Sequence, residues 1–184
     1  MLSAMLAAAP RSLPRLTLQR SVLRAWRPGD VATLALHANN PKIAANLRDR
    51  FPHPYAEANA RDYIERVIDS AATSFAIAVD GAAVGGVGVH PQDDIHRLCA
   101  EVGYWLAEPF WGRGIASEAL RAATDWAFTA LDLQRVFGMV FDGNPASVRV
   151  LEKAGFEREA RLRRAAVKYG HVTDLLLYAR LAPP

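Results

Sequence analysis

Apolar residues recur at helical spacing in several stretches of this chain. Within 115–131, for example, the recurrence at steps of three and four residues is typical of one face of an α-helix. Asp30 lies where an N-cap is expected, directly before the first such stretch. The predicted helices cover residues 31–38, a short segment from 41 to 47, and residues 57–71, 115–131 and 145–154.

The remaining apolar stretches are shorter and have the residue types that favour β-strands. Asp80-Gly81 lies between two of them and predicts a hairpin turn. The predicted strands cover residues 16–24, 74–79, 83–89, 98–106 and 135–141, followed by two strands from Phe156 onward, the last at 174–181. This order predicts a flexible lead-in at 1–15 and one mixed α/β domain over 16–184.

The composition is that of an ordinary globular protein, with 51% hydrophobic and 22% charged residues among 184. The 22 Lys and Arg against 19 Asp and Glu leave a net charge of +3, too small a surplus to indicate direct nucleic-acid binding. No apolar run approaches the ~20 residues of a membrane span. Residues 1–10 lack the basic start of a secretion signal. We therefore expect a cytoplasmic protein that does not bind membranes.

Cysteine and histidine give little sign of metal or redox chemistry. Cys99 is the lone cysteine, so the chain has no internal disulfide, and its apolar neighbours predict core packing. The histidines show neither H-x-H nor H-E-x-x-H spacing, so no metal site is expected. His90 and His96 flank a polar loop at 91–95, which either lines a substrate opening or is an ordinary solvated loop.

Two glycines open directly into the predicted helix that starts at Ile115. Gly112 and Gly114 allow the backbone to turn its N–H groups toward one point, and a helix N-terminus adds a positive dipole end. This combination predicts a phosphate or pyrophosphate site, although a plain strand-to-helix turn also uses such glycines. Ser117 replaces the third glycine of the dinucleotide fingerprint, and no lysine follows as in a P-loop.

The segment Trp111-Gly-Arg-Gly-Ile-Ala116 resembles the [QR]-x-x-G-x-[GA] acyl-coenzyme A loop of the GNAT N-acetyltransferases, with Trp111 in place of Gln or Arg. The flanking segments Glu101–Leu106 and Ala116–Leu120 resemble the RimJ/RimL-like branch, which acetylates N-terminal amines of ribosomal proteins. Residues 144–156 are similar to a second conserved segment of that branch. Asn144 followed by Pro145, with Gly155 at the other end, also fits an ordinary helix start and stop.

The resemblance implies the GNAT fold: a central, mostly antiparallel sheet of six or seven strands, flanked by helices, with a splayed strand pair at the acyl-CoA site. It also implies acetyl-CoA as cofactor. The N–H groups of 112–116 would hold the pyrophosphate, with help from the Ser117 hydroxyl. The backbone at 105–106 would pair with the pantetheine arm, and Asn144 would hydrogen-bond that arm. Lys153 either reaches a cofactor phosphate or is a solvated helix residue. The cofactor-binding residues so implied are Trp105, Leu106, Trp111, Gly112, Arg113, Gly114, Ile115, Ala116, Ser117, Asn144 and Lys153.

Attack of an amine on a thioester needs a proton acceptor for the amine and a donor for the leaving thiolate. Glu101 matches an acidic position of the branch and is the candidate base; the alternative is a structural carboxylate paired with an arginine. Ser147 is the candidate donor toward the coenzyme sulfur; the alternative is a hydroxyl bonded back to its helix. Tyr104 is a weaker candidate acid, for which packing is favoured.

The acceptor implied by the branch is a protein N-terminal amine, with a ribosomal protein as the example. Arg48, Arg50 and His53 lie in an Arg-rich loop that resembles the variable substrate loop of the family and would meet an acidic or carboxylate-bearing acceptor. The basic tract Arg158–Lys168, expected on two strands, is either a solvated sheet face or a ribosomal-RNA contact. Two alternatives to this function stay open: the acceptor is a small-molecule amine (a polyamine, an amino acid or an antibiotic), or the chain is a non-catalytic acyl-CoA-binding module. A homodimer formed through the last strands also stays open.

Overall fold

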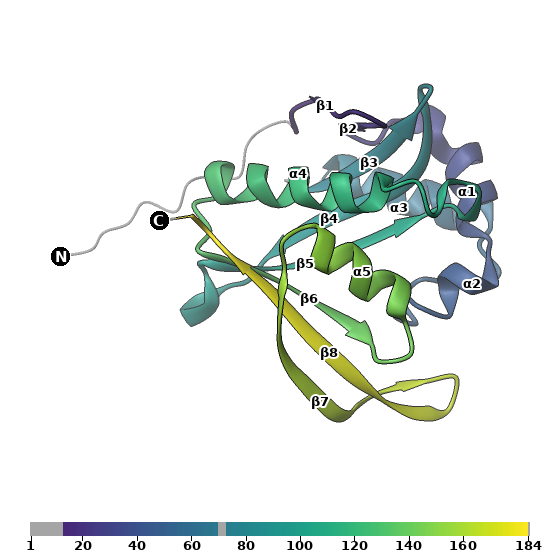
Figure 1. The fold of residues 1–184 in the computed structure, drawn as a ribbon. Coiled ribbons are helices and arrows are strands. Elements are labelled where there is room, and N and C mark those ends of the chain that lie inside the picture. Colours follow the sequence, from purple (N-terminus) through teal and green to yellow (C-terminus); the bar gives the residue numbers. More distant parts are fainter. Residues whose placement is uncertain (1–12, 70–72, 184) are drawn as a thin grey trace.

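An eight-stranded sheet forms the centre of the fold and carries helices on both faces (Figure 1). The computed structural model describes residues 13–69 and 73–183. Most of the predicted lead-in at 1–15, and the end of the predicted helix 57–71, lie outside the described residues. No helix in the described part of the chain is long and apolar enough to cross a membrane.

The helices and strands follow the predicted order closely. The strands are β1 (Leu16–Thr17), β2 (Val22–Arg24), β3 (Ser74–Val79), β4 (Ala82–Pro91), β5 (Cys99–Leu106), β6 (Arg135–Phe141), β7 (Glu157–Lys168) and β8 (His171–Leu181). The helices are α1 (Val31–Ala38), α2 (Pro41–Ala44), α3 (Glu57–Asp69), α4 (Ile115–Ala130) and α5 (Pro145–Lys153), with short 3-10 helices η1 (Pro28–Asp30), η2 (Asp94–His96) and η3 (Glu108–Phe110).

The strand order is β1-β2-β3-β4-β5-β6-β8-β7, and every neighbouring pair is antiparallel except β5 and β6. Six or seven strands were predicted. The additional strand arises at 16–24, where the chain turns between Leu18 and Ser21 and forms a hairpin instead of one strand. The basic tract Arg158–Lys168 lies on one strand, β7, and not on two.

Alternating strand residues build two separate cores, one on each face of the sheet. Phe75 and Ile77 of β3 pack in the core that α4 and α5 cover. Ala76, which lies between them, packs in the core that α1 and α3 cover. Figure 1 shows α4 and α5 on one side of the sheet and α1 and α3 on the other. Successive side chains of one strand therefore lie alternately on the α4/α5 face and on the α1/α3 face of the sheet.

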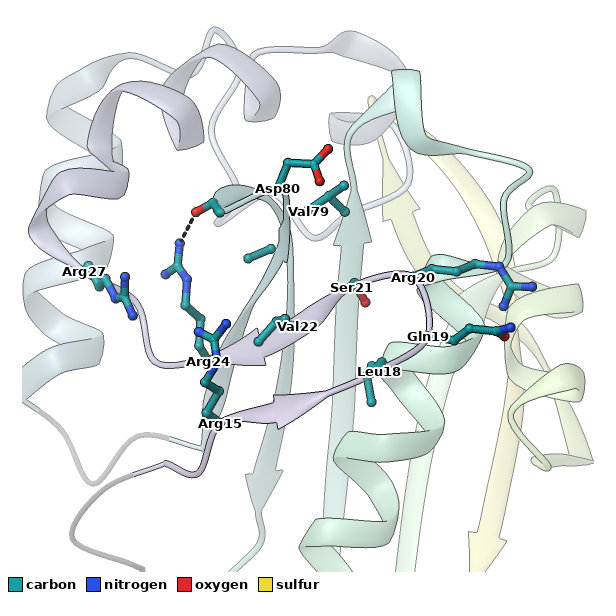
Figure 2. A pocket seen from close by; sticks show the side chains of 12 residues that line it. Arg15, Leu18, Gln19, Arg20, Ser21, Val22, Arg24, Arg27, Val79 and Asp80 are labelled. Atoms are coloured by element: carbon teal, nitrogen blue, oxygen red, sulfur yellow. Dashed lines mark hydrogen bonds between the residues drawn. The ribbon is translucent and has the colours of Figure 1, made fainter.

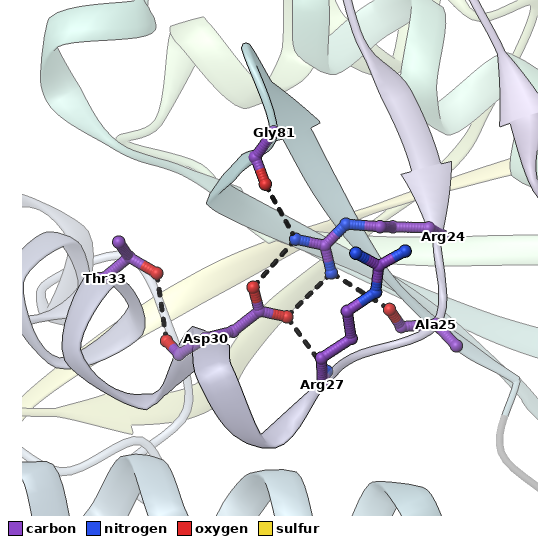
Figure 3. A network of polar contacts seen from close by, with 6 residues as sticks. All are labelled: Arg24, Ala25, Arg27, Asp30, Thr33 and Gly81. Carbon is purple, nitrogen blue, oxygen red and sulfur yellow. Dashed lines mark hydrogen bonds and ion pairs between the residues drawn. The ribbon is translucent and has the colours of Figure 1, made fainter.

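A buried ion pair holds the start of the sheet to the first helical segment (Figure 3). Arg24 donates from Nη1 and Nη2 to the two carboxylate oxygens of Asp30, at 2.7 and 2.8 Å, and both side chains are less than a tenth exposed. Arg24 also donates to the Gly81 carbonyl in the β3–β4 turn, and Asp30 accepts the Arg27 N–H. The pair thus joins β2, η1 and the hairpin turn in one network.

Candidate active site

β5 and β6 run side by side for only three residues before they separate. Cys99–Glu101 pair with Arg135–Phe137, although β5 continues to Leu106 and β6 to Phe141. Beyond these three residues, no strand in the described part of the chain pairs with the β5 backbone on this side. The predicted splayed strand pair is confirmed, and it offers an open strand edge to an extended ligand.

The antiparallel ladder between β4 and β5 decides which backbone groups face this gap. Ala107 donates its N–H to the Val84 carbonyl (2.8 Å), which fixes the phase of the ladder. Because hydrogen-bonded and non-hydrogen-bonded pairs alternate, the backbone groups of Trp105 face β4, whereas those of Tyr104 and Leu106 face the gap. The backbone contact expected of Trp105 and Leu106 is therefore better suited to Tyr104 and Leu106.

The glycine loop lies directly before α4 and has the backbone conformation that only glycine adopts easily. Gly112 and Gly114 have φ angles of +74° and +78°, in the left-handed region. Gly114 precedes the first helical residue, Ile115, whose side chain is buried in the core. The loop therefore exposes the N–H groups of a helix start while the helix stays anchored. The Trp111 indole turns back and donates to the Leu106 carbonyl (2.6 Å).

Three further residues predicted to bind the cofactor, Arg113, Ala116 and Ser117, lie in the loop or in the first turn of α4. The Arg113 guanidinium stacks over the Phe110 ring, 5.4 Å from its centroid. Ala116 and Ser117, in the first turn of α4, are half-buried. The Arg113 side chain therefore lies against η3, and Ser117 lies in the first turn of α4, directly after the loop.

Asn144 and Lys153 mark the two ends of α5. The Asn144 side chain accepts the Ser147 N–H (3.1 Å), so it acts as the N-cap that the sequence also allowed. Lys153 is exposed at the C-terminal end, where its carbonyl accepts a hydrogen bond from Arg121 of α4. The structure thus gives Asn144 a capping role and places Lys153 at the exposed C-terminal end of α5, next to Arg121 of α4.

Tyr104 and Ser147 meet across the gap, on the face covered by α4 and α5. The Tyr104 hydroxyl lies 2.6 Å from Ser147 Oγ and 3.0 Å from the Ser147 carbonyl oxygen. Burial raises the pKa of Tyr104 well above its usual range, and the hydrogen bond with Ser147 opposes this only in part. The phenol is therefore protonated at neutral pH. Sequence reasoning favoured a packing role for Tyr104 and had no signal that it would contact Ser147.

The Glu101 side chain lies on the opposite face of the sheet from Tyr104, the face covered by α1 and α3. Its carboxylate accepts a hydrogen bond from the Arg48 guanidinium, and its side chain is one-fifth exposed. The Trp105 side chain lies on this same face of β5, and its ring centroid is 6.1 Å from that of Phe51. The predicted base and one predicted substrate residue are thus in contact, and the pairing with an arginine that the sequence left open is present.

His90 of β4 lies directly opposite Glu101 in the ladder, so both side chains emerge on the same face. Although the residue as a whole is exposed, packing around its imidazole lowers the pKa of His90. The positive charges of Arg50 and Arg48 lower this pKa further, whereas the negative charge of Glu101 raises it. His90 is therefore neutral at pH 7. The sequence placed it only beside a polar loop.

The loop after α2, which carries Arg48 and Arg50, is held by a lysine of β7, the strand at the edge of the sheet. Lys168 of β7 donates from Nζ to the Leu47 carbonyl and to the Asp49 carboxylate, both at 2.7 Å. This holds the segment that carries Arg48 and Arg50. His53 is exposed in the loop that follows, and within the described residues no hydrogen bond links it to Glu101. The sequence named Lys168 only as the end of a basic tract, and its contact with Asp49 was missed because the two residues are 119 positions apart.

A hollow of about 430 Å³ lies elsewhere, at the outer edge of the sheet (Figure 2). It is lined by the β1–β2 and β3–β4 turns, and several arginines surround it. Neither Glu101, Tyr104 nor Ser147 lines this hollow. Glu101, Tyr104 and Ser147 thus lie around the gap between β5 and β6, whereas Arg20 of the β1–β2 turn lines this hollow.

Comparison with known proteins agrees with this geometry. The acetyltransferase (GNAT) domain model matches residues 20–157. The chain is 33% identical over 127 residues, 69% of each chain, to "Putative ribosomal N-acetyltransferase YdaF" of Bacillus subtilis. It is 29% identical over 121 residues to spermidine N(1)-acetyltransferase of Escherichia coli, covering 65% of this chain and 64% of that one. The solved structure of Mycobacterium smegmatis RimJ with a CoA disulfide is 26% identical, with a TM-score of 0.77 over 88% of this chain and 82% of that one.

The chain therefore belongs to the GNAT acetyltransferases. It is an acetyl-CoA-dependent N-acetyltransferase, and its mixed α/β fold with one parallel strand pair at the gap is the GNAT fold.

Proposed function

We propose that this N-acetyltransferase acetylates the N-terminal amine of a protein or peptide that carries acidic residues close to that amine. The observation that supports the proposal is that the side chains of β5 place a carboxylate on one face of the sheet and a hydroxyl pair on the other. Glu101 and Arg48 lie on one face and the Tyr104–Ser147 pair on the other, on either side of the strand that borders the gap.

The cofactor would bind along the face of α4 and α5. The exposed N–H groups of Gly112 and Gly114 at the start of α4 suit a pyrophosphate. The backbone of Tyr104 and the N–H of Leu106, which face the gap, suit the amides of a pantetheine arm, whereas the Leu106 carbonyl already accepts the Trp111 indole N–H. Bound acetyl-CoA supplies the acetyl thioester.

The residues around the gap then divide the proton transfers between them. The amine nitrogen forms the new bond to the acetyl carbonyl carbon while the carbon–sulfur bond breaks. Glu101 takes the proton that the amine nitrogen loses, directly or through water. Ser147 gives a proton to the leaving sulfur, and the Tyr104 hydroxyl, 2.6 Å away, replaces it. Protons and charge balance over one turnover, because each residue regains its starting state through solvent.

The charges near Glu101 favour an acidic acceptor over a polyamine. Arg48 is paired with Glu101, and Arg50 is exposed and close enough to His90 to lower its pKa. Lys168 adds a third positive charge, but Glu101 and Asp49 offset two of the three, so the group keeps one net positive charge, that of Arg50. This net positive charge would repel a polycation such as spermidine, the acceptor named for one relative of 29% identity, and would attract a carboxylate.

Replacing Glu101 by Gln tests the assignment of the acceptor face. We expect kcat to fall by about 10²- to 10³-fold at pH 7 while the affinity for CoA is unchanged, because a proton acceptor is lost and the cofactor face is untouched. The matched control is Glu159→Gln, which removes another carboxylate paired with an arginine, Arg135. Unchanged turnover in Glu101→Gln would remove Glu101 from the mechanism.

A further inference from the structure

The turn between β1 and β2 brings an arginine to the glycine loop. Arg20 Nη1 lies 4.0 Å from the position that a β-carbon on Gly114 would take. Gly114 is the residue from which α4 begins, so the guanidinium lies beside the exposed N–H groups of the helix start. Arg20 is exposed, and its side chain has no hydrogen-bond partner among the described residues.

Glu118, in the first turn of α4, fastens this turn to the helix. Its Oε1 accepts the Gln19 N–H (2.8 Å) and its Oε2 accepts the Arg20 N–H (3.2 Å). Both carboxylate oxygens are therefore directed at the backbone of the turn. Figure 2 shows the Gln19 and Arg20 side chains extending away from Arg15, on the opposite side of the hairpin.

The loop itself offers few side-chain donors to a phosphate. Trp111 stands where the family pattern has Gln or Arg, and its single donor is used by the Leu106 carbonyl. Arg113 is stacked over Phe110. Arg113 is turned toward Phe110, whereas Arg20 reaches Gly114 from another part of the chain with its side-chain donors free of hydrogen bonds in the described residues.

We propose that Arg20 is a phosphate-binding residue of the cofactor site, delivered from the β1–β2 turn and positioned by Glu118. A planar guanidinium suits a pyrophosphate because it can donate two parallel hydrogen bonds to it. This inference rests on the proposed assignment of the glycine loop to the pyrophosphate. It adds a contact from a part of the chain that lies 94 residues before Gly114.

The test is the calorimetric affinity of the full chain for CoA and for dephospho-CoA, which lacks the 3′-phosphate and keeps the pyrophosphate. Arg20→Ala should bind both ligands about 10- to 100-fold more weakly, the range for hydrogen bonds to charged groups. Its KM for acetyl-CoA should rise with kcat unchanged. Arg15→Ala, an exposed arginine of the same hairpin, is the control and should bind like the wild type.

The variant Glu118→Ala tests whether Glu118 positions Arg20 or affects the cofactor only through its negative charge. If Glu118 acted on the cofactor only by its negative charge, removing it would tighten CoA binding. If it positions Arg20, its removal weakens binding, and it weakens binding no further in a chain that already carries Arg20→Ala. Should Glu118→Ala fail to fold, the Arg20→Ala comparison still decides.

Three results would overturn the inference. CoA affinity of Arg20→Ala equal to that of the wild type would remove Arg20 from the site. A loss seen with CoA and absent with dephospho-CoA would place Arg20 on the 3′-phosphate and not on the pyrophosphate. A wild-type chain that does not bind CoA would overturn the proposed cofactor site as well, whereas wild-type binding with an unaffected Arg20→Ala variant would overturn this inference alone.

Discussion

The Tyr104 hydroxyl lies 2.6 Å from Ser147 Oγ and joins the open end of β5 to the first turn of α5. Tyr104 also lies 3.0 Å from the Ser147 carbonyl, which can only accept a hydrogen bond. When the phenol donates to Ser147 Oγ, the serine proton is free for a group in the gap. In that arrangement the proposed relay passes the Tyr104 proton to Ser147 and the Ser147 proton to the leaving sulfur, and solvent then restores the phenol.

Tyr104→Phe should lower kcat by about 10²-fold, with KM for acetyl-CoA within about twofold, because a proton donor is lost and the backbone contacts remain. Ser147→Ala should have a similar effect, and the double variant should be no slower than either single one, since both act in one relay. Tyr178→Phe is the control, because Tyr178 is also hydrogen-bonded to α5, at Glu152. Additive losses in the double variant would contradict the relay.

The imidazole of His90 should titrate below its usual value near 6.5, as measured by the NMR shift of its ring protons. Packing and Arg50 lower this pKa, whereas Glu101 opposes the shift. Arg50→Met should therefore raise the pKa of His90, and Glu101→Gln should lower it further. Shifts of the opposite sign would contradict the placement of these three groups on one face.

The same pKa has a consequence for stability. Because the folded-state pKa of His90 is depressed, the unfolded chain binds the proton more readily. The stabilisation is present above pH 6.5 and is lost as the pH falls through the folded-state pKa. The free energy of unfolding, measured in urea between pH 7.5 and 5.5, should depend less on pH in His90→Gln. An identical pH dependence in both proteins would contradict the shift.

Removing one partner of the buried Arg24–Asp30 pair should lower the free energy of unfolding strongly. Asp30→Ala leaves a buried guanidinium without its carboxylate, and we expect a loss of about 3–5 kcal/mol in the free energy of unfolding. The double variant Arg24→Met, Asp30→Leu should lose less than Asp30→Ala. Glu159→Ala, which breaks an exposed pair, should lose at most about 1 kcal/mol. Denaturant unfolding measures all three.

Gly85 permits the close approach of β4 to the strand that lines the gap. A β-carbon there would lie 2.5 Å from the Trp105 carbonyl oxygen and 3.1 Å from Leu106 Cα. Gly85→Ala should therefore destabilise the fold by about 1–3 kcal/mol and weaken CoA binding, because β5 must shift. Gly103→Ala, whose added β-carbon meets nothing within 4 Å, is the control. Equal stability of the two variants would contradict this packing.

The fold was predictable because its signals are local. The periodicity of α4, the Asp80-Gly81 turn and the Asn144-Pro145 helix start depend on near neighbours, and each is present as expected. The hairpin at 16–24 was missed because its turn contains no Gly, Pro, Asn or Asp, the residues that most strongly mark a turn. The polar run Gln19-Arg20-Ser21, which interrupts the apolar pattern inside the Leu18–Ser21 hydrogen bond, was the one available signal.

The site was predictable only where a motif is contiguous. Gly112 and Gly114 could be recognised, whereas the contact of Tyr104 with Ser147 joins residues 43 positions apart. The ion pair of Arg48 with Glu101 spans 53 positions. Such contacts depend on how β5 meets α5 and the loop after α2. Trp105 shows the same limit, because the phase of the β4–β5 ladder decides where its backbone groups point.

The acceptor is the central claim, and release of thiol from acetyl-CoA tests it most directly. The purified chain would be given peptides with free N-termini, matched in length and differing in acidic or basic second and third residues, and in parallel spermidine and other small amines. We predict release with the peptides, fastest with the acidic ones, and a preference reduced about two- to fivefold in Arg50→Glu. Release with small amines alone would contradict the account and make this a metabolite acetyltransferase.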